Sequence, residues 1–323
     1  MKTVRLGRTE AQVSRVSLGT WSHGGPNVNK GRSVGWAGSD PVRDKASLIA
    51  AFRSGIDHWD TADVYGDGQS ERLIGEVWPE VPRDRIFLAT KVGWNPGPHS
   101  HFYHPAWMRT QLERSLRQLQ VEHIDLYYLH HCQFGEHESL FDDAMEQLHR
   151  ARDEGKIRFT GLSDWDADKI MTYIDRADPD VVQPYRNVAA DTWESSGLKA
   201  WIADHDAGAA FFSPLRHGLL LGKYLEATEF EEGDVRSSIA AFQDTALLAQ
   251  IQSCVGSLRE RFQEHSQPVL HALLGALFED SPTGCALVGQ RNPGQSEAAS
   301  QCGDALSGED ALWVRELFSE VTV

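Results

Sequence analysis

Short apolar runs alternate with longer amphipathic stretches over most of the chain. Each run is rich in Val, Ile, Leu or Phe and is followed by a turn, a pattern typical of repeated strand–helix units. Several runs are apolar at consecutive positions, as expected of strands that are covered on both faces. The predicted strands span residues 15–20, 56–61, 86–91, 124–130, 157–163, 181–184, 209–213 and 285–288.

Two of the intervening stretches, 105–119 and 140–154, show a helical pattern most clearly. Their large apolar residues fall on one side of a helix, and Gly155 is a suitable stop for the second. Strands that alternate with helices imply a parallel sheet with the helices outside it. Eight such units predict a closed (β/α)8 barrel, the TIM barrel.

The composition fits one folded domain. Of the 323 residues, 41% are hydrophobic and 24% are charged, which is close to the average for globular proteins. No linker, repeat or low-complexity stretch divides the chain. We therefore expect a single domain over residues 1–323, with long loops at the C-terminal face of the barrel.

Three loops are longer or more charged than ordinary connections. Residues 22–41 and 94–105 exceed the usual connection length, and residues 225–240 carry five acidic side chains. Loops of this length in compact domains usually bind ligands or cover a site. Because the first two follow strands, we expect them at the C-terminal face, where barrels of this kind place their active sites.

The overall charge disfavours several classes of partner. A net charge of -16 and a pI near 5.3 repel nucleic-acid backbones and anionic membrane surfaces. No apolar run is long enough to predict a membrane span, and the first residues lack the apolar core of a signal peptide. We expect a cytoplasmic protein that acts on a small molecule; the sequence does not set the number of subunits.

Four cysteines are scattered along the chain without a Cys-x-x-Cys pair. This spacing favours reduced, structural thiols over a disulfide framework or a zinc site. We therefore predict no bound metal. The cysteines are Cys132, Cys254, Cys285 and Cys302.

Four ionisable residues occur at or just after the ends of three successive predicted strands. Asp60 lies at the end of the first strand, Tyr65 follows it in a short loop (HWDTADVYG, residues 58–66), and Lys91 and His130 end the next two strands. Each residue alone has an ordinary structural explanation. Because the ends of parallel strands meet at one rim of a barrel, their joint spacing favours a catalytic set.

These residue types suit the reduction of a carbonyl group. Hydride transfer leaves negative charge on oxygen, so a proton donor is needed there, and the Tyr65 phenol can serve if its pKa is lowered. Lys91 would lower it, Asp60 would hold Lys91, and His130 would donate a hydrogen bond to the oxygen. In the reverse direction Tyr65 acts as the base for alcohol oxidation.

The set of Asp60, Tyr65, Lys91 and His130 resembles the catalytic tetrad of aldo-keto reductases. The resemblance extends from about residue 4 to about residue 300 and implies a TIM barrel that uses a nicotinamide cofactor. The other matching segments are LGRT at 6–9, SLGT at 17–20, GLSD at 161–164, FSPL at 212–215, GKY at 222–224 and VGQRNP at 288–293.

No Gly-x-Gly-x-x-Gly motif follows a predicted strand, so a Rossmann cofactor site is unsupported. The resemblance implies instead that the cofactor lies across the barrel mouth, with an aromatic ring against the nicotinamide. The residues implied to bind it are Gly19, Thr20, Ser163, Asp164, Gln183, Phe212, Ser213, Leu215, Gly218, Lys223, Gly289, Arg291 and Gln295.

The chain departs from the family pattern at three places. Asp164 and Phe212 stand where the family often has Asn and Tyr, and Ala298-Ala299 follow Gln295 where it often has Glu-Asn for the adenine. Arg291 remains as a cation for a 2′-phosphate. We therefore predict NADP as the cofactor, with NAD as the alternative.

Aromatic residues near the predicted strand ends suggest a substrate pocket formed by Trp21, Trp59, Trp94 and Phe102. Such walls suit sugars, aromatic aldehydes and flat ketones alike, so the substrate class stays open. Two other functions also stay open. One is a cofactor-binding regulatory subunit with little turnover; the other is a metal-dependent hydrolase that uses the histidines at 99, 101, 130 and 131.

Overall fold

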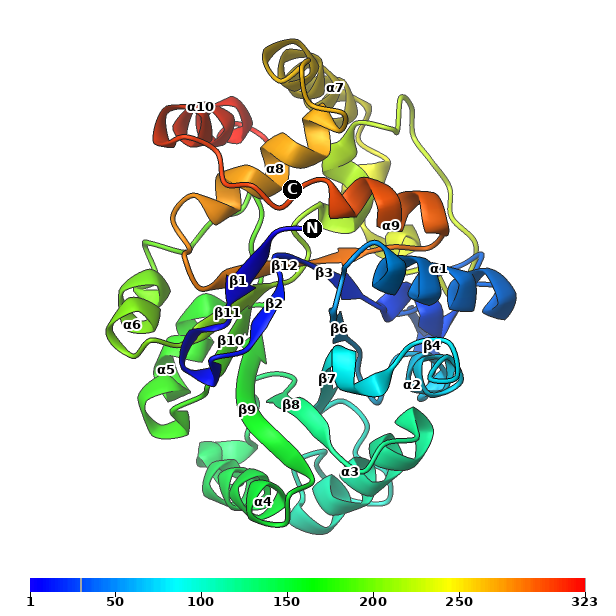
Figure 1. Cartoon of the computed structure of the whole chain (residues 1–323), viewed down its shortest axis with the longest axis vertical. Helices are drawn as coiled ribbons and strands as arrows, with labels where there is room; N and C mark the ends of the chain where they lie inside the picture. The colour runs from blue at the N-terminus through cyan, green and yellow to red at the C-terminus, as the bar shows by residue number, and fades with distance from the viewer. Residues whose placement is uncertain (30, 323) are drawn as a thin grey trace.

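Eight parallel strands form a closed barrel in this computed structural model, which describes residues 1–29 and 31–322. The strands follow one another around the barrel in chain order, and helices surround them (Figure 1). This architecture confirms the predicted (β/α)8 fold. The barrel strands are β3 (Val16–Gly19), β6 (His58–Asp60), β7 (Phe87–Val92), β8 (Ile124–Leu129), β9 (Ile157–Asp164), β10 (Val181–Pro184), β11 (Gly208–Phe211) and β12 (Gly284–Gly289).

The predicted strands all correspond to barrel strands, and each boundary agrees within two residues. The two helices predicted most clearly are also present, as α3 and α4. The helices are α1 (Pro41–Arg53), α2 (Gln69–Gly75), α3 (Pro105–Leu119), α4 (Phe141–Asp153), α5 (Ala167–Ala177), α6 (Leu198–Asp204), α7 (Thr245–Arg261), α8 (Pro268–Phe278), α9 (Pro293–Ser300) and α10 (Gly308–Phe318).

Several helices begin at a side chain that satisfies the first free backbone N–H groups. At α1, for example, the Asp40 carboxylate accepts from the Arg43 N–H and Pro41 occupies the first turn. Such caps contribute about 1 kcal/mol each and fix where a helix starts. The other capping residues are Asp166 at α5, Asp244 at α7, Asn292 at α9 and Ser307 at α10.

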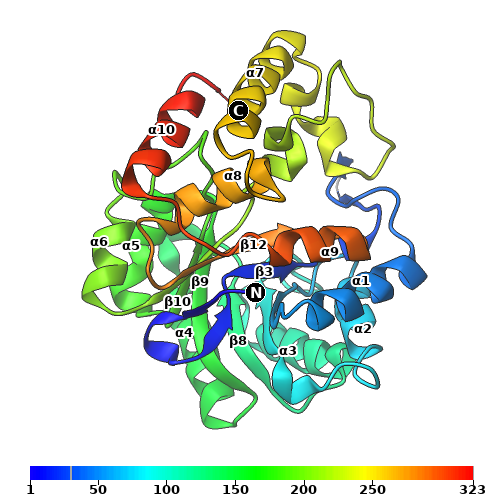
Figure 2. The ribbon, with the colours of Figure 1, turned by 45° about the horizontal axis from the view of Figure 1, so that its top comes forward.

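The core has two layers. Alternate residues of the strands point into the barrel or out toward the helices, so the larger outer layer lies between strands and helices. Leu126 and Tyr128 of β8 belong to the inner layer, while Tyr127 and Leu129 belong to the outer one. Helices α7, α8 and α10 pack against one another on one side of the barrel (Figure 2).

A short hairpin closes the N-terminal end of the barrel. It consists of β1 (Thr3–Arg5) and β2 (Gln12–Ser14), and in Figure 1 it lies in front of β10 and β11. Its apolar side chains Val4, Leu6 and Val13 join the inner layer of the core. This hairpin was not predicted from the sequence, because three-residue strands are too short to show a repeat.

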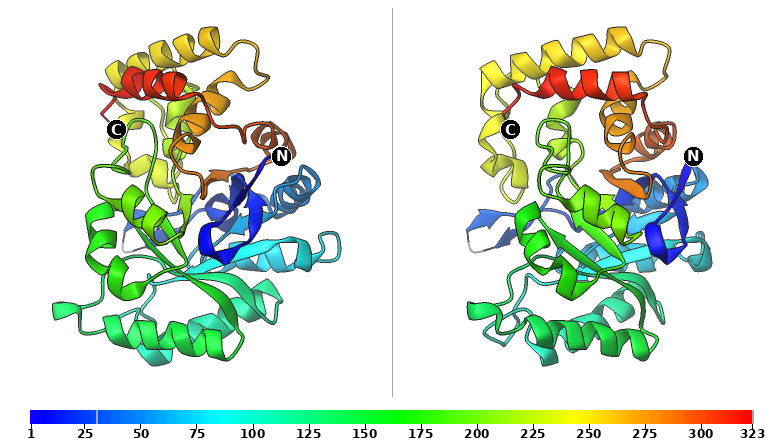
Figure 3. Two further views of the ribbon diagram at one scale, coloured as in Figure 1. Left: turned by 60° about the vertical axis from the view of Figure 1, so that its left-hand side comes forward. Right: turned by 90° about the vertical axis from the view of Figure 1, so that its left-hand side faces the viewer.

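Two of the three long loops meet at the other end of the barrel. The loop after β3 contains the small strands β4 (Val28–Asn29) and β5 (Arg32–Ser33). In Figure 3 these strands lie beside the loop of residues 225–240. Backbone bonds join them: the N–H groups of residues 27 and 35 donate to Gly233 O, and the N–H of Val235 donates to Gly35 O. We call residues 25–29, 31–37 and 231–236 together the strap.

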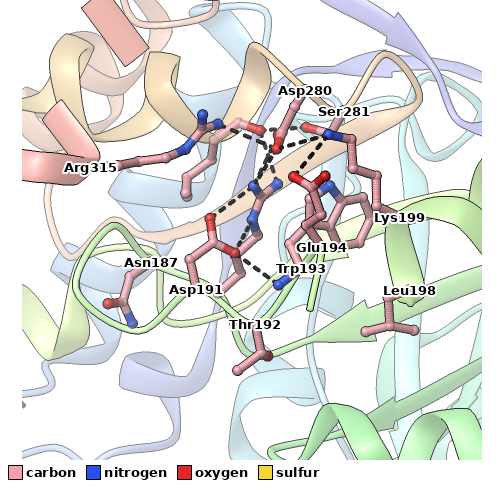
Figure 4. Close-up of polar contacts among 12 residues, drawn as sticks. Asn187, Asp191, Thr192, Trp193, Glu194, Leu198, Lys199, Asp280, Ser281 and Arg315 are labelled. Atoms are coloured by element: carbon pink, nitrogen blue, oxygen red, sulfur yellow. Dashed lines mark hydrogen bonds and ion pairs between the residues drawn. The ribbon is translucent and has the colours of Figure 1, made fainter. Parts of the chain in front are cut away.

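A buried arginine fastens the loop after β10 to the outer helices. Arg186 forms a two-bond ion pair with Asp191, at 2.9 Å for each bond, and a second pair with Asp280, at 2.9 Å. Its Nη1 also donates to Leu277 O at the end of α8. Figure 4 shows Asp280 reached from the other side by Arg315 of α10. This network joins segments that are far apart in the sequence.

Among the described helices, none has both the length and the apolar character needed to cross a bilayer.

Candidate active site

Three of the four predicted catalytic residues meet at a buried ammonium. Lys91 Nζ lies 2.5 Å from Asp60 Oδ1, 2.7 Å from Thr61 O and 3.3 Å from the Tyr65 hydroxyl. The side chain of Lys91 is almost fully buried. Its charge is therefore balanced by Asp60 rather than by water, and it points at the tyrosine oxygen.

The turn after β6 brings Tyr65 to Lys91. The Tyr65 N–H donates to Ala62 O, and Gly66 continues the turn with φ +62°. A side-chain carbon at Gly66 would come within 2.0 Å of Gly24 O. Only glycine fits this contact, which fixes the tyrosine loop against the loop after β3.

The electrostatics differ in one respect from the sequence prediction. Burial raises the pKa of the Tyr65 phenol, and the positive charge of Lys91 opposes this rise without cancelling it. The expected lowering is thus outweighed by desolvation. For Lys91 itself, burial lowers the pKa, but Asp60 and Tyr65 outweigh burial and raise it. The resting site therefore holds a protonated phenol beside a charged lysine.

His130 completes the predicted set. Its ring lies edge-on to the Tyr65 ring, with centroids 6.0 Å apart, and its backbone N–H donates to Val92 O. Burial, followed by the charge of Lys91, lowers the pKa of His130 well below its usual value, so the ring is neutral. Its Nδ1 has no hydrogen-bond partner among the described residues. His131 is turned aside and packs 4.8 Å from Trp94.

Hydrogen bonds from other strands of the barrel hold Asp60. Gln183 Nε2 donates to Asp60 Oδ2 at 2.9 Å, and Ser163 Oγ donates to Gln183 O at 2.9 Å. Asp164 lies next to them, where its two oxygens accept from the backbone N–H groups of Cys132 and Asp166. Gln183 thus links the predicted nicotinamide site to the catalytic carboxylate.

Thr20 joins the loop after β3 to the end of β6, because its hydroxyl donates to Asp60 O at 2.9 Å. Gly19, the residue before it, ends β3 beside Asp60 and next to Gly289 of β12. No atom lies within 4 Å of the position that a Gly289 side-chain carbon would take. The rim of the barrel is therefore open at Gly289.

The loop after β11 carries a lysine. The Lys223 ammonium lies beside Gly218, 3.1 Å from where a side-chain carbon would be, and forms no ion pair within residues 1–29 and 31–322. Ser213 and Leu215 lie in the same loop, and Phe212 precedes them at the end of β11.

Arg291 lies where the strap meets α9. Its Nη2 donates to Ala37 O, and its guanidinium is 5.8 Å from the Trp36 ring. Gln295 Oε1 accepts from the Arg291 N–H at 2.7 Å, so α9 orients this residue. Burial, followed by the charges of Arg236 and Arg43, lowers the pKa of Arg291.

Comparison with known proteins agrees with this geometry. The family model described as "Aldo/keto reductase family" matches residues 15–309. The chain belongs to the aldo/keto reductase family.

Relatives of this aldo/keto reductase include enzymes of several names. An aldo-keto reductase of Bacillus subtilis is 30% identical, and the match covers 96% of this chain and 91% of that protein. An NADH-specific methylglyoxal reductase of Escherichia coli is 28% identical, with 78% of each protein covered. The structure of a glycerol dehydrogenase from Gluconobacter oxydans matches with a TM-score of 0.81 and 27% identity, covering 100% of this chain and 97% of that one.

The aromatic surroundings of the tetrad agree only in part with the sequence prediction. Trp21 stacks on Tyr65 at 5.9 Å, Trp94 lies 5.9 Å from His130, and Phe102 contacts His131. Trp59 does not belong to this reductase pocket. It is fully buried in the outer core layer, where it stacks on Trp78 and donates to Ile56 O.

Three further rings near the site were not predicted. Trp165, which is 46% exposed, and Tyr185 both pack against Phe212. His217 lies between Trp21 and Trp36. Trp165 and Tyr185 directly follow β9 and β10, so they could have been predicted from their positions after predicted strands. His217 lies in the irregular part of a loop, where no sequence pattern indicates its position.

The remaining histidines and cysteines of the reductase show ordinary packing. His99 stacks on His104 at 4.0 Å. Within the described part of the chain, no three His, Cys, Asp or Glu side chains are grouped to hold a metal ion. The four cysteines are buried free thiols, and burial strongly raises the pKa of Cys132.

Proposed function

We propose that this family member interconverts an aldehyde or ketone and the corresponding alcohol, with Tyr65 as the general acid and base and NADP(H) as the cofactor. The observation that carries the proposal is the placement of Lys91 Nζ within 2.5 Å of Asp60 and 3.3 Å of the Tyr65 hydroxyl. A charged amine held in this way stabilises the phenolate that remains after proton transfer.

Each tetrad residue has a separate task in the proposed reaction. The bound nicotinamide supplies the hydride in reduction or accepts it in oxidation. Neutral His130 donates its N–H to the carbonyl oxygen and orients it, and Tyr65 gives that oxygen its proton. Asp60, held by Gln183, keeps Lys91 charged and pointed at Tyr65. In alcohol oxidation the Tyr65 phenolate takes the proton back.

The residues at the barrel mouth fit a dinucleotide. Phe212 would stack on the nicotinamide, and Ser163, Asp164 and Gln183 would bind its carboxamide. Lys223, beside Gly218 and without an acidic partner among the described residues, suits the pyrophosphate. The remaining predicted residues, Gly19, Thr20, Ser213, Leu215 and Gly289, would border this path.

The charges around Arg291 favour NADP over NAD. Arg236 is neutralised by Asp234 at 2.6 Å, but Arg291 and Arg43 have no ion pair within the part of the chain that the structure describes. A 2′-phosphate would relieve the repulsion between these like charges. NAD stays the alternative, because the Escherichia coli methylglyoxal reductase among the relatives is NADH-specific.

The proton-donor role is tested with Tyr65→Phe. We expect carbonyl reduction to fall at least about 100-fold while cofactor affinity stays nearly unchanged, because the phenol acts on the reacting oxygen alone. Tyr173→Phe, the same change on helix α5, is the matched control and should retain full activity. Reduction by the Tyr65→Phe protein at the wild-type rate would rule out the proposed role.

The cofactor proposal is tested by titrating the protein's fluorescence with NADPH and NADH in parallel, followed by turnover with a panel of aldehydes and ketones. Tight binding of NADPH with repeated turnover is the expected result. Binding without turnover would favour a regulatory role, for which a probable potassium channel beta subunit of Arabidopsis thaliana, 26% identical over 69% of this chain, is the precedent. Binding of neither cofactor would overturn the proposal.

A further inference from the structure

A second group of ionisable side chains lies directly behind the tetrad. Asp63 is part of the turn between Asp60 and Tyr65, and Glu71 is in the first turn of α2. Both carboxyl groups are fully buried, at 2% and 0% exposure. The proposed reaction gives neither of them a task. Buried carboxyl groups are rare unless they are paired, so their presence calls for an explanation.

Asp63 and Glu71 are both hydrogen-bonded to β7, the strand that carries Lys91. The Thr90 hydroxyl donates to Glu71 Oε1 at 2.7 Å, and Thr90 precedes Lys91 in β7. The backbone N–H of Asp63 donates to Lys91 O. Gln111 Nε2 of α3 donates to Asp63 Oδ2 at 2.7 Å. A change of charge at either carboxyl group therefore acts on the backbone and the field around Lys91.

The hydrogen bonds leave one oxygen of the pair without a partner. Glu71 Oε2 can accept from the Gln118 amide of α3 at 2.7 Å, in addition to the Thr90 bond at Oε1. Asp63 Oδ1 is buried and has no partner among the described residues. An unpaired buried carboxylate oxygen is costly, which favours a bound proton. Burial raises the pKa of Asp63 to about 6. Burial, and then the charge of Asp63, raise the pKa of Glu71 to about 7.

The charged and titratable groups that face this pair come from every neighbouring element. Arg114 of α3 lowers both pKa values, but its Nη2 is already bound to Asp67 at 2.8 Å. Lys91 of β7 also acts on Asp63 and is itself neutralised by Asp60. From β8, the Tyr127 hydroxyl is buried and unpartnered within the described residues. These cations balance one negative charge on the pair more readily than two.

We propose that Asp63 and Glu71 are positioning residues that carry one proton between them, and that loss of this proton keeps Tyr65 in its protonated, proton-donating form. The inference rests on the proposed function of Tyr65. It goes further, because it assigns a role to two residues outside the tetrad.

The direction of the effect follows from charge. When the pair loses its one proton, a second negative charge appears near Tyr65 and Lys91. Negative charge disfavours the phenolate, so Tyr65 ionises only at higher pH. As pH rises through neutrality, the pair therefore extends the range over which Tyr65 can donate a proton. Removing one carboxyl group should shift the ionisation of Tyr65 to lower pH.

The test compares Glu71→Gln with Glu76→Gln. Both changes remove one negative charge from the same part of the chain, but Glu76 is exposed at the end of α2. The pH profile of kcat/KM for carbonyl reduction is measured for each. We expect the alkaline limb to move down by about 0.5 to 1 pH unit in Glu71→Gln and to stay in place in Glu76→Gln. Asp63→Asn should shift it in the same direction.

A purely structural role for Glu71 would lower the rate at every pH without moving the limb, and that result would overturn the proposal. A shift of equal size in Glu76→Gln would do so as well. If Glu71→Gln does not fold, Asp63→Asn carries the same comparison.

A second measurement does not depend on turnover. With ¹³C label at the tyrosine ring carbon that bears the hydroxyl, NMR follows the ionisation of Tyr65 directly, and Tyr65→Phe assigns its signal. The signal should titrate at lower pH in Glu71→Gln than in the wild type; an unchanged titration contradicts the proposal. If the wild type fails to reduce any carbonyl while this shift is present, the proposed function is wrong and the carboxyl pair stands.

Discussion

Tyr65 is held between an ammonium and a flat aromatic wall. Lys91 approaches its hydroxyl at 3.3 Å, and Trp21 stacks on its ring at 5.9 Å. Burial outweighs the charge of Lys91 in setting the pKa of the phenol. The same wall strengthens the interaction with Lys91, since charges attract more strongly where water is excluded.

The proposed preference for NADP depends on a single side chain, Arg291. We expect Arg291→Gln to reduce the preference for NADPH over NADH about 10-fold, because a charge-assisted bond to the 2′-phosphate is lost. The measurement is the ratio of kcat/KM values for the two cofactors. Arg150→Gln, an exposed change on α4, serves as the control. An unchanged ratio in Arg291→Gln would show that the phosphate is bound elsewhere.

The sequence predicts the tetrad but not its setting. Asp60, Lys91 and His130 could be found because strand ends of a parallel barrel converge at one rim. The error at Trp59 was avoidable: it precedes Asp60 in a strand, and adjacent strand residues face opposite sides. By contrast, the burial of Glu71 depends on how α3 packs over α2, which no local pattern reveals.

At the scale of elements, the β1–β2 hairpin depends on a close backbone approach. Gly7 has φ +53°, and a side-chain carbon there would lie 2.2 Å from the Ala207 backbone, where β11 begins. Arg5 fixes the same contact by a pair of bonds to Asp206, at 2.6 and 2.7 Å. The hairpin cannot move away without exposing the inner core layer.

We therefore expect Gly7→Ala to lower the free energy of unfolding by about 3 kcal/mol, through backbone strain and displacement of the hairpin. Urea unfolding measures this. The rate of the folded enzyme should hardly change, because the hairpin lies at the end of the barrel away from Tyr65. Gly256→Ala is the control: it is in helix α7 with no atom within 4 Å, and it should gain about 0.5 to 1 kcal/mol. If the Gly7→Ala protein were as stable as the wild type, the side chain at position 7 would cause no backbone strain and no displacement of the hairpin.

Elements with a clear repeat were predicted to within two residues, whereas the small strands were not predicted at all. β4 and β5 have two residues each and exist because the loop that contains them pairs with Gly233, about 200 positions later in the chain. Such pairing is set by tertiary contact. The sequence indicated that residues 22–41 lie at the active-site end and marked residues 225–240 as a charged loop, but it did not show that the two loops bind each other.

For the whole molecule, buried histidines set the response to acid. Burial lowers the pKa of four of them to about 3 or 4, so they stay neutral in the folded protein. The unfolded chain binds protons at these sites once the pH falls below about 6.5. Their contribution to stability is therefore present at neutral pH and lost as the pH falls toward 4. The residues are His23, His58, His131 and His217.

Asp63 and Glu71 act in the opposite direction, because their raised pKa values make the folded protein hold protons that the unfolded chain releases. Their stabilising effect is present at low pH and lost as the pH rises through about 7. Burial also raises the pKa of Asp57 and Asp60 and lowers the pKa of His101, His130 and His271. Seven histidines therefore oppose four carboxyl groups, and we expect the Tm to fall between about pH 7 and about pH 5. Each uncompensated histidine costs about 1.4 kcal/mol per pH unit.

Thermal unfolding followed by circular dichroism across this range measures the effect. Glu71→Gln removes one of the opposing groups, so its Tm should fall more steeply with acid than that of the wild type. A Tm that is constant over the range would mean that the histidines are hydrated in the folded protein.

The hairpin that closes one end of the barrel has a practical consequence for engineering. Because the reacting residues, the strap and the aromatic pocket all lie at the opposite end, heat tolerance and substrate choice are controlled by separate sets of positions. Variants at the hairpin end can be screened for thermostability without re-optimising catalysis. Substitutions at the active-site end can then be added to the most stable variants. The two searches can run in parallel and be combined.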